Sequence, residues 1–207
     1  MAGTQHYDAF LMAGILLNLT PGNDTIYILS RTMAQGRKAG IMSVLGIATG
    51  SLVHTFFAAV GLSVIIAQSS WLFNIIKYAG AAYLFYIGVR MILSGSPVID
   101  LHKPEVEKYK KIYWQAVLTN VLNPKVALFF ISFLPQFIDP AYHNHYLSFI
   151  ILGLYFTATG TLWCLLLALF ASVISTALIK NNKTGSYLTK ACGFILVGLG
   201  IKVALVK

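Results

Sequence analysis

The chain has 207 residues, of which 57% are hydrophobic and only 10% are charged, and its mean hydropathy is +0.76. This composition lies well outside the range of soluble globular domains and indicates an integral membrane protein. The formal net charge of +9 does not point to nucleic acid, because the Lys and Arg residues are spread over alternate connections rather than gathered on one face.

Six apolar runs are long enough to cross a bilayer. They cover approximately residues 7–33, 40–67, 72–93, 113–138, 146–179 and 190–206. The sequence therefore predicts an all-α integral membrane protein with six transmembrane helices. Cys164 and Cys192 lie inside these runs without a CxxC pattern, and we interpret them as small buried residues rather than metal ligands.

The first run is interrupted near its middle by the stretch Asn18-Leu19-Thr20-Pro21-Gly22-Asn23-Asp24. Pro21 has no amide hydrogen and Gly22 eases a change of direction, so the helix is expected to break here. Thr followed by Pro is a helix-start pattern, which predicts that Thr20 caps the second half-helix. Irregular backbone and a carboxylate at membrane depth are costly unless they face protein or a water-filled cavity. The break therefore favours a functional site, and a kinked helix with purely structural polar residues is the alternative.

The two halves of the chain share three short patterns in the same order. The pairs are Asn18-Leu19-Thr20-Pro21 with Val121-Leu122-Asn123-Pro124, Ala48-Thr49-Gly50-Ser51-Leu52 with Ala158-Thr159-Gly160-Thr161-Leu162, and Lys77, Gly80 and Arg90 with Lys190, Gly193 and Lys202. The polar stretch 94–112 separates the halves, so we predict two three-helix repeats, 1–93 and 113–207, joined by a basic linker. An odd number of spans inverts the second repeat. Inverted repeats whose first helices are broken are typical of secondary transporters, with the substrate site near the midplane.

The second break repeats the chemistry of the first. Asn123 is predicted to cap a half-helix that starts at Pro124, with Lys125 directly inside it. Two half-helix N-termini, one beside Asp24 and one carrying Lys125, are expected to face each other. Their amide hydrogens and helix dipoles suit a carboxylate.

The residues of both breaks form the predicted substrate site. They are Asn18, Thr20, Pro21, Gly22, Asn23, Asp24, Asn120, Asn123, Pro124 and Lys125. Asp24 is predicted to hold the ammonium of a zwitterionic substrate and to couple transport to protons, while Lys125 holds the carboxylate. A permanent Asp24–Lys125 ion pair is the structural alternative. His54 is a second candidate for proton transfer, although a lone His on an apolar helix is more commonly a hydrogen-bonded structural residue.

The basic residues also predict the topology. Eleven Lys and Arg residues accompany the connections after the first, third and fifth runs, namely Arg31, Arg37, Lys38, Arg90, Lys103, Lys108, Lys110, Lys111, Lys180, Lys183 and Lys190. The connections 68–71 and 139–145, and the segment before residue 7, contain none. By the positive-inside rule the three basic connections are cytoplasmic and both termini lie outside.

Three stretches carry a family resemblance: PGNDTIYILSRTMAQGRKAGIMSVLGIATGSLVH, KYAGAAYLFYIGVRMIL and LTNVLNPKVALFFISFLPQFID. Together they resemble the LysE/RhtB family of amino-acid exporters over nearly the whole chain. The resemblance implies a carrier of the bacterial inner membrane that exports amino acids such as homoserine, threonine, leucine or lysine, coupled to the proton gradient. The motif residues that it implies are Pro21, Gly22, Asp24, Asn123, Pro124 and Lys125. Asn23 departs from the family pattern, which usually has a second proline there, and this implies a looser break.

Three other functions fit the sequence less well. A metal or inorganic-ion exporter would need His, Cys or several carboxylates at ligand spacing, and apart from the separate Cys164 and Cys192 the runs offer only Asp24 and His54 at membrane depth. An intramembrane enzyme would need a second carboxylate, a Ser–His pair or a metal cluster, and neither GxSxG nor HExxH occurs. A scaffold would make no use of paired breaks. We therefore predict no catalytic activity, cofactor or metal site, and as partners a small amino acid, protons and the lipid bilayer. The oligomeric state, including a homo-oligomer, stays open.

Overall fold

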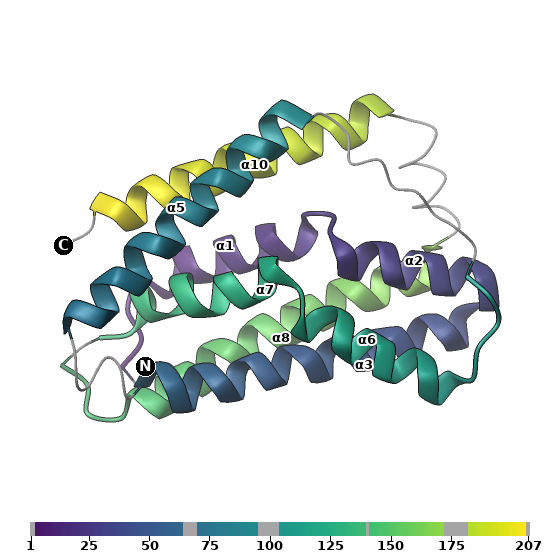
Figure 1. The fold of residues 1–207 in the computed structure, drawn as a ribbon, viewed down its shortest axis with the longest axis horizontal. Helices are drawn as coiled ribbons and strands as arrows, with labels where there is room; N and C mark the ends of the chain where they lie inside the picture. Colours follow the sequence, from purple (N-terminus) through teal and green to yellow (C-terminus); the bar gives the residue numbers. More distant parts are fainter. Residues whose placement is uncertain (1–2, 64–69, 95–103, 140, 172–181, 206–207) are drawn as a thin grey trace.

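The computed structural model describes residues 3–63, 70–94, 104–139, 141–171 and 182–205, and these residues form an all-helical bundle (Figure 1). The α-helices are α1 (Tyr7–Leu19), α2 (Asn23–Gln35), α3 (Arg37–Phe57), α5 (Ser70–Ser94), α6 (Tyr109–Val121), α7 (Pro124–Leu128), α8 (His145–Leu169) and α10 (Asn182–Leu205). The π-helical segments are η1 (Ala58–Leu62) and η2 (Phe129–Phe133), and η3 (Leu134–Phe137) is a 3-10 helix. One isolated β-bridge joins Thr4 to Ile138.

Two of the described helices are long and apolar enough to cross a membrane, Arg37–Leu62 and His145–Leu169. A third candidate is the pair Tyr109–Val121 and Pro124–Phe137, which bends by 46° at its break. The prediction of a helical membrane protein is confirmed at this level. Residues 64–67, 172–179 and 206 of the predicted runs lie outside the described residues, and α10 begins at Asn182, before the predicted start at residue 190.

The first break separates α1 from α2. The Thr20 amide donates to the carbonyls of Leu16 (3.1 Å) and Leu17 (3.2 Å), and the Thr20 hydroxyl donates to Leu16 at 2.8 Å. Thr20 therefore closes the C-terminus of α1, and α2 follows Gly22 without a side-chain cap. The prediction that Thr20 caps α2 is wrong. The reason is that Pro21 offers no amide to Leu17, so the donors of Thr20 turn back to the carbonyls at the end of α1.

The second break has the predicted cap. Asn123 has extended backbone, and its Oδ1 accepts a hydrogen bond from the Lys125 amide at 3.1 Å. Pro124 occupies the first helical position of α7, where its missing amide hydrogen costs nothing. The two breaks therefore resemble each other in sequence but end and restart their helices by different hydrogen bonds.

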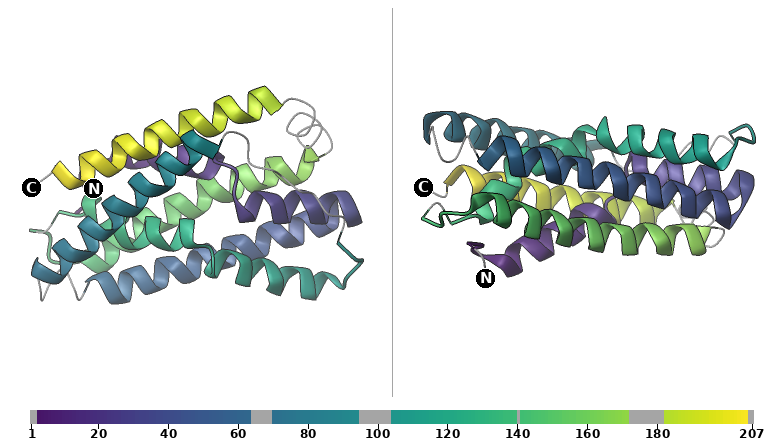
Figure 2. Two further views of the ribbon diagram at one scale, coloured as in Figure 1. Left: turned by 45° about the horizontal axis from the view of Figure 1, so that its top comes forward. Right: turned by 90° about the horizontal axis from the view of Figure 1, so that it is seen from below.

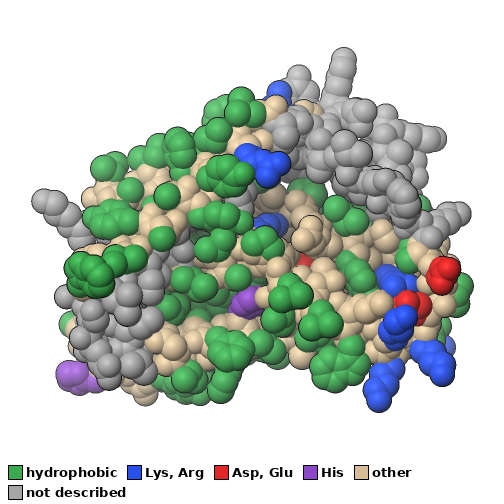
Figure 3. Space-filling model, in the orientation of Figure 1, with side chains coloured by type: hydrophobic (Ala, Val, Ile, Leu, Met, Phe, Trp, Pro, Cys, Tyr) green, Lys and Arg blue, Asp and Glu red, His purple; other side chains and the backbone are tan. Residues whose placement is uncertain are grey.

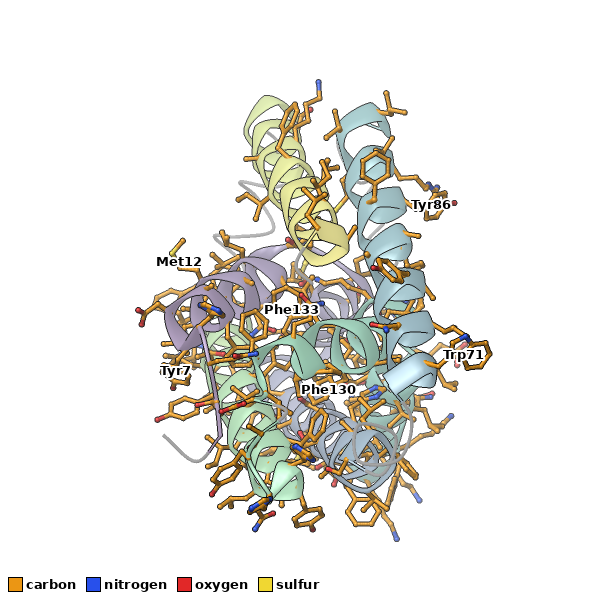
Figure 4. All side chains as sticks on the ribbon, turned by 90° about the vertical axis from the view of Figure 1, so that its left-hand side faces the viewer. Tyr7, Met12, Trp71, Tyr86, Phe130 and Phe133 are labelled. Carbon is orange, nitrogen blue, oxygen red and sulfur yellow. The ribbon has the colours of Figure 1, made fainter. Side chains whose placement is uncertain are left out.

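Two groups of helices make up the bundle. α3 packs along α6 and α8, and α1 packs against α8, while α5 packs mainly along α10. The views in Figure 2 show α5 and α10 side by side, and Figure 4 shows this pair projecting from the remaining helices. In Figure 4, Phe130 and Phe133 lie in the interior, whereas Met12, Trp71 and Tyr86 lie at the periphery.

An aromatic core joins α1, η2 and α8 beside the breaks. The rings of Phe129 and Phe156 stack at 4.5 Å between centroids, and Phe10 lies 6.2 Å from Phe129. All three side chains are buried. Because buried aromatic residues contribute a large apolar area and prefer defined geometries, this core holds the two broken helices against α8.

The C-terminal half of α2 is fastened to the linker and to the start of α6. The Arg31 guanidinium, 7% exposed, donates to Glu107 Oε2 at 3.0 Å and to Gln115 Oε1 at 2.8 Å. Gln35 exchanges two hydrogen bonds with the backbone of Glu107, at 2.9 and 3.0 Å. Lys111 completes the set with an ion pair of 2.7 Å to Glu107 Oε1. We call these five residues the Arg31 clamp. Figure 3 shows Lys and Arg side chains gathered at the end of the molecule away from the chain termini.

We expect Glu107→Gln to lower the melting temperature of the purified protein at pH 7. The hydrogen bond from Lys111 outweighs desolvation and, together with the charge of Arg31, holds the pKa of Glu107 below its ordinary value. A lowered pKa means that the carboxylate stabilises the fold above about pH 4.3, the unfolded value, and that this stabilisation is lost as the pH falls through the folded pKa. The difference between variant and wild type should therefore shrink in acid.

Thermal unfolding in detergent between pH 3 and pH 7 measures this effect. Glu105→Gln is the matched control, because Arg31 contacts only the backbone carbonyl of Glu105 (3.0 Å) and the residue is exposed. Equal melting temperatures for wild type and Glu107→Gln at pH 7 would contradict a stabilising clamp.

Candidate functional site

The two helix breaks lie side by side and are joined by hydrogen bonds. The Lys125 side chain from the start of α7 donates to the backbone carbonyl of Thr20 at 2.7 Å. Asn120, in the last turn of α6, donates from Nδ2 to Asp24 Oδ2 at 2.9 Å. The predicted meeting of the two breaks is therefore present in the structure.

Asp24 lies in the first turn of α2, where the helix dipole favours a negative charge. Lys125 and His54 lie close enough to act on its charge, and the side chain of Asn123 is also near. Its second oxygen, Oδ1, is buried without a hydrogen-bond partner among the described residues. The structure therefore brings Asp24 and Lys125 together.

A cavity lies between the breaks, α3 and α8. It leaves about 40 Å³ for the centre of a water-sized sphere, so it is large enough to hold water. Seven predicted site residues lie on its wall, namely Asn18, Thr20, Gly22, Asp24, Asn120, Asn123 and Lys125. Pro21 and Pro124 shape the breaks without lining this cavity, and Asn23 lines a separate groove with Tyr27, Arg31 and Thr119.

Residues of α3 and α8 complete the wall, and sequence reasoning missed them. Ser51 and Thr157 share a buried hydrogen bond of 2.8 Å across the cavity wall. Thr161, Trp163 and Cys164 line it from further along α8. The repeated Ala-Thr-Gly stretches of the two halves were the available signal, because they mark the turns of α3 and α8 that face the breaks.

Each break presents an Asn to a Gly in the other half of the chain. A methyl group placed on Gly160 would lie 3.0 Å from Asn18 Oδ1, and one placed on Gly50 would lie 2.7 Å from Asn120 Cβ. Asn18 is also held by donating to Phe156 O (3.4 Å) and Thr159 Oγ1 (3.3 Å). Gly50 and Gly160 therefore let the two breaks pack closely against α3 and α8.

His54 does not line the cavity. Its Nε2 lies 3.1 Å from the carbonyl oxygen of Asn120, and its ring stacks on Phe130 at 5.5 Å. This is the hydrogen-bonded arrangement that the structural alternative describes, and a part in proton transfer stays a prediction. Among the described residues no three His, Cys, Asp or Glu side chains cluster as metal ligands.

A polar cavity between two broken helices inside an apolar helical bundle is the arrangement of a membrane transporter. A family model described as LysE type translocator matches residues 15–207. The chain belongs to this family, whose members are transporters rather than enzymes.

Three relatives span almost the same length. An uncharacterized membrane protein of Bacillus subtilis, YrhP, is 36% identical over 95% of this chain and 97% of its own length. An uncharacterized membrane protein of Pseudomonas aeruginosa, PA4757, is 27% identical over 98% of this chain and 96% of its own. The leucine efflux protein of Salmonella typhimurium is also 27% identical, over 98% and 96%. No solved structure matches the chain significantly.

We expect Gly50→Ala to destabilise the protein by about 1–3 kcal/mol, the usual cost of overpacking. The new methyl group would overlap Asn120 Cβ, which cannot move without α6. Gly160→Ala should cost less, because its nearest neighbours are the terminal atoms of Asn18. Gly61→Ala is the control, since nothing lies within 4 Å of that position.

Unfolding in detergent, followed by circular dichroism, ranks the three variants. The expected order of destabilisation is Gly50→Ala, then Gly160→Ala, then Gly61→Ala. A Gly50→Ala protein as stable as Gly61→Ala would mean that α3 and α6 are not in close contact at the second break.

Proposed function

We propose that this protein is a secondary transporter that exports small amino acids of the homoserine, threonine and leucine class across the bacterial inner membrane in exchange for protons. The observation that carries the proposal is the placement of Asp24 and Lys125 on the wall of one cavity between two helix breaks. One anion and one cation at short range match the two charges of a zwitterionic amino acid.

The contacts of the two charges suggest how a substrate enters. In the described structure the Lys125 ammonium is held by the Thr20 carbonyl, a neutral acceptor. A substrate carboxylate is a stronger acceptor, because charge-assisted hydrogen bonds exceed neutral ones. The substrate ammonium would bind Asp24 beside Asn120. Both ends of the molecule are then satisfied in a site that excludes most water.

Proton coupling follows from the chemistry of the same carboxylate. Protonation of Asp24 from the outside removes the charge that holds the substrate ammonium, so the substrate is released outward. The substrate class is supported by the name of the leucine efflux protein of Salmonella typhimurium, a relative over almost the full length.

The packing also supports six spans in two inverted repeats. α1 of the first half lies against α8 of the second through Asn18 and Gly160, and α6 of the second half lies against α3 of the first through Asn120 and Gly50. This exchange of equivalent contacts is what a duplicated unit would produce. Both chain ends lie at the same end of the bundle in Figure 1, which fits an even number of spans.

The function is tested first by screening leucine, threonine and homoserine, with their toxic analogues, for export from cells that express the chain. We expect resistance to at least one analogue and a lower internal level of the matching amino acid. If cells expressing the folded protein export none of the three, the proposed substrate class is wrong.

Asp24→Asn should abolish proton-driven export and leave a folded protein. The amide has the size of the carboxylate but neither its charge nor its proton, so it holds the substrate ammonium weakly and cannot couple to a gradient. Reconstituted vesicles with an imposed proton gradient measure the rate of amino-acid transport.

Asp8→Asn is the control for this variant, because Asp8 is an exposed carboxylate in the first turn of α1. It should transport as the wild type does. Normal transport by Asp24→Asn at a saturating gradient would remove Asp24 from the coupling mechanism.

The topology is tested by thiol labelling. In a background without Cys164 and Cys192, Ala141→Cys should react with an impermeant reagent added to intact cells, and Lys110→Cys should react only after the membrane is opened. Both positions are exposed, and the positive-inside rule places the basic stretch in the cytoplasm. The reverse labelling pattern would place both termini inside.

A further inference from the structure

Four buried side-chain polar atoms have no hydrogen-bond partner among the described residues. They are Asp24 Oδ1, Ser63 Oγ, Asn120 Oδ1 and Trp163 Nε1. Three of the four belong to residues that line the cavity between the breaks. Buried polar groups in native proteins are almost always paired, so such a concentration in one cavity points to a ligand that pairs them.

Two of the three atoms are acceptors. Asn120 Nδ2 donates to Asp24 Oδ2, so the amide is oriented with its oxygen as the remaining acceptor. Asp24 offers its second oxygen in the same way. A primary ammonium has three hydrogens to donate, so it can satisfy both oxygens at once.

The third atom is a donor of a different kind. The indole N–H of Trp163 donates and cannot accept. A substrate ammonium therefore cannot pair with it. Every zwitterionic amino acid carries one strong acceptor, its carboxylate, and Lys125 on the same cavity wall already favours that group. Cys164, next to Trp163, lies within electrostatic range of both Asp24 and Lys125, so this part of α8 is close to both charges.

We propose that Trp163 is a specificity-determining residue that donates its indole N–H to the substrate carboxylate, while Asp24 Oδ1 and Asn120 Oδ1 accept from the substrate ammonium. This inference rests on the proposed function and deepens it. The site then requires a primary ammonium and a free carboxylate in one molecule. An amino-acid amide, which lacks the charged acceptor, is a poor substrate.

A purely structural role for Trp163 predicts a different result. The side chain also packs against the buried cluster of Ile28, Leu29 and Leu167, and in that role the shape of the ring matters and the N–H does not. Loss of packing would weaken transport of every substrate equally. The two roles are therefore separated by comparing leucine with leucine amide.

Trp163→Phe keeps an aromatic ring and removes the N–H. In vesicles, the KM for leucine should rise about tenfold to hundredfold, the effect of losing a hydrogen bond to a charged group. The KM for leucine amide should rise by a smaller factor, about twofold to tenfold, because its carbonyl oxygen is a neutral acceptor. Trp71→Phe, at a position 73% exposed, is the control and should leave both values unchanged. An equal rise for both compounds, or no rise for leucine, would overturn the carboxylate contact.

A second measurement leaves Trp163 intact. The chain has three Trp residues, and Trp71 and Trp114 are exposed, so Trp71→Phe/Trp114→Phe leaves Trp163 as the single indole fluorophore. Leucine should shift its emission saturably, at concentrations near the transport KM, and leucine amide should do so only weakly. Leucine transport without any change in emission would overturn the inference while leaving the proposed function in place. Failure of the wild type to transport leucine, threonine or homoserine would overturn both.

Discussion

The hydrogen bond from Lys125 to the carbonyl of Thr20 is the contact on which the arrangement of the two breaks depends. In an apolar bundle, each backbone group that a broken helix releases must find a partner inside the protein. The Thr20 carbonyl stands at the end of α1, where the helix dipole is negative and a cation is favoured. Asp24 stands in the first turn of α2, where an anion is favoured. The first break therefore favours a cation at the end of α1 and an anion at the start of α2. The second break supplies the cation, Lys125.

Close packing explains how these polar contacts are held in position. Asn18 and Asn120 each lie against a glycine of the other half, so the breaks approach α8 and α3 more closely than larger residues would permit. The aromatic core of Phe10, Phe129 and Phe156 packs α1 and η2 against α8. The charged groups thus sit between a rigid apolar region and a region of small and hydroxyl-bearing side chains.

The Arg31 clamp gives the opposite end of the bundle a different character. There, α2 is joined to the linker and to α6 by charged and amide side chains rather than by apolar packing. The Lys111 side chain is 62% exposed, whereas Arg31, at 7%, is buried within the clamp. The separate groove lined by Asn23, Tyr27 and Arg31 runs between these elements and reaches the neighbourhood of the breaks.

The sequence by itself determined the helical class, the membrane environment, the position of both breaks and the cap at Asn123. These follow from local chemistry: apolar run length, the missing amide of proline, and the short reach of an Asn side chain to the next backbone amide. The resemblance in the motifs of both halves led to the family, which the family model confirms.

Only the tertiary structure decided the rest. Thr20 donates its hydrogen bonds to the last carbonyls of α1, which would otherwise lack partners, and not to α2. The packing of α6 on α3 places Asn120 beside Asp24, and the packing of α8 places Trp163 at the cavity wall. Partners distant along the chain are selected by packing and by the need to satisfy buried polar atoms, and no local pattern encodes that choice.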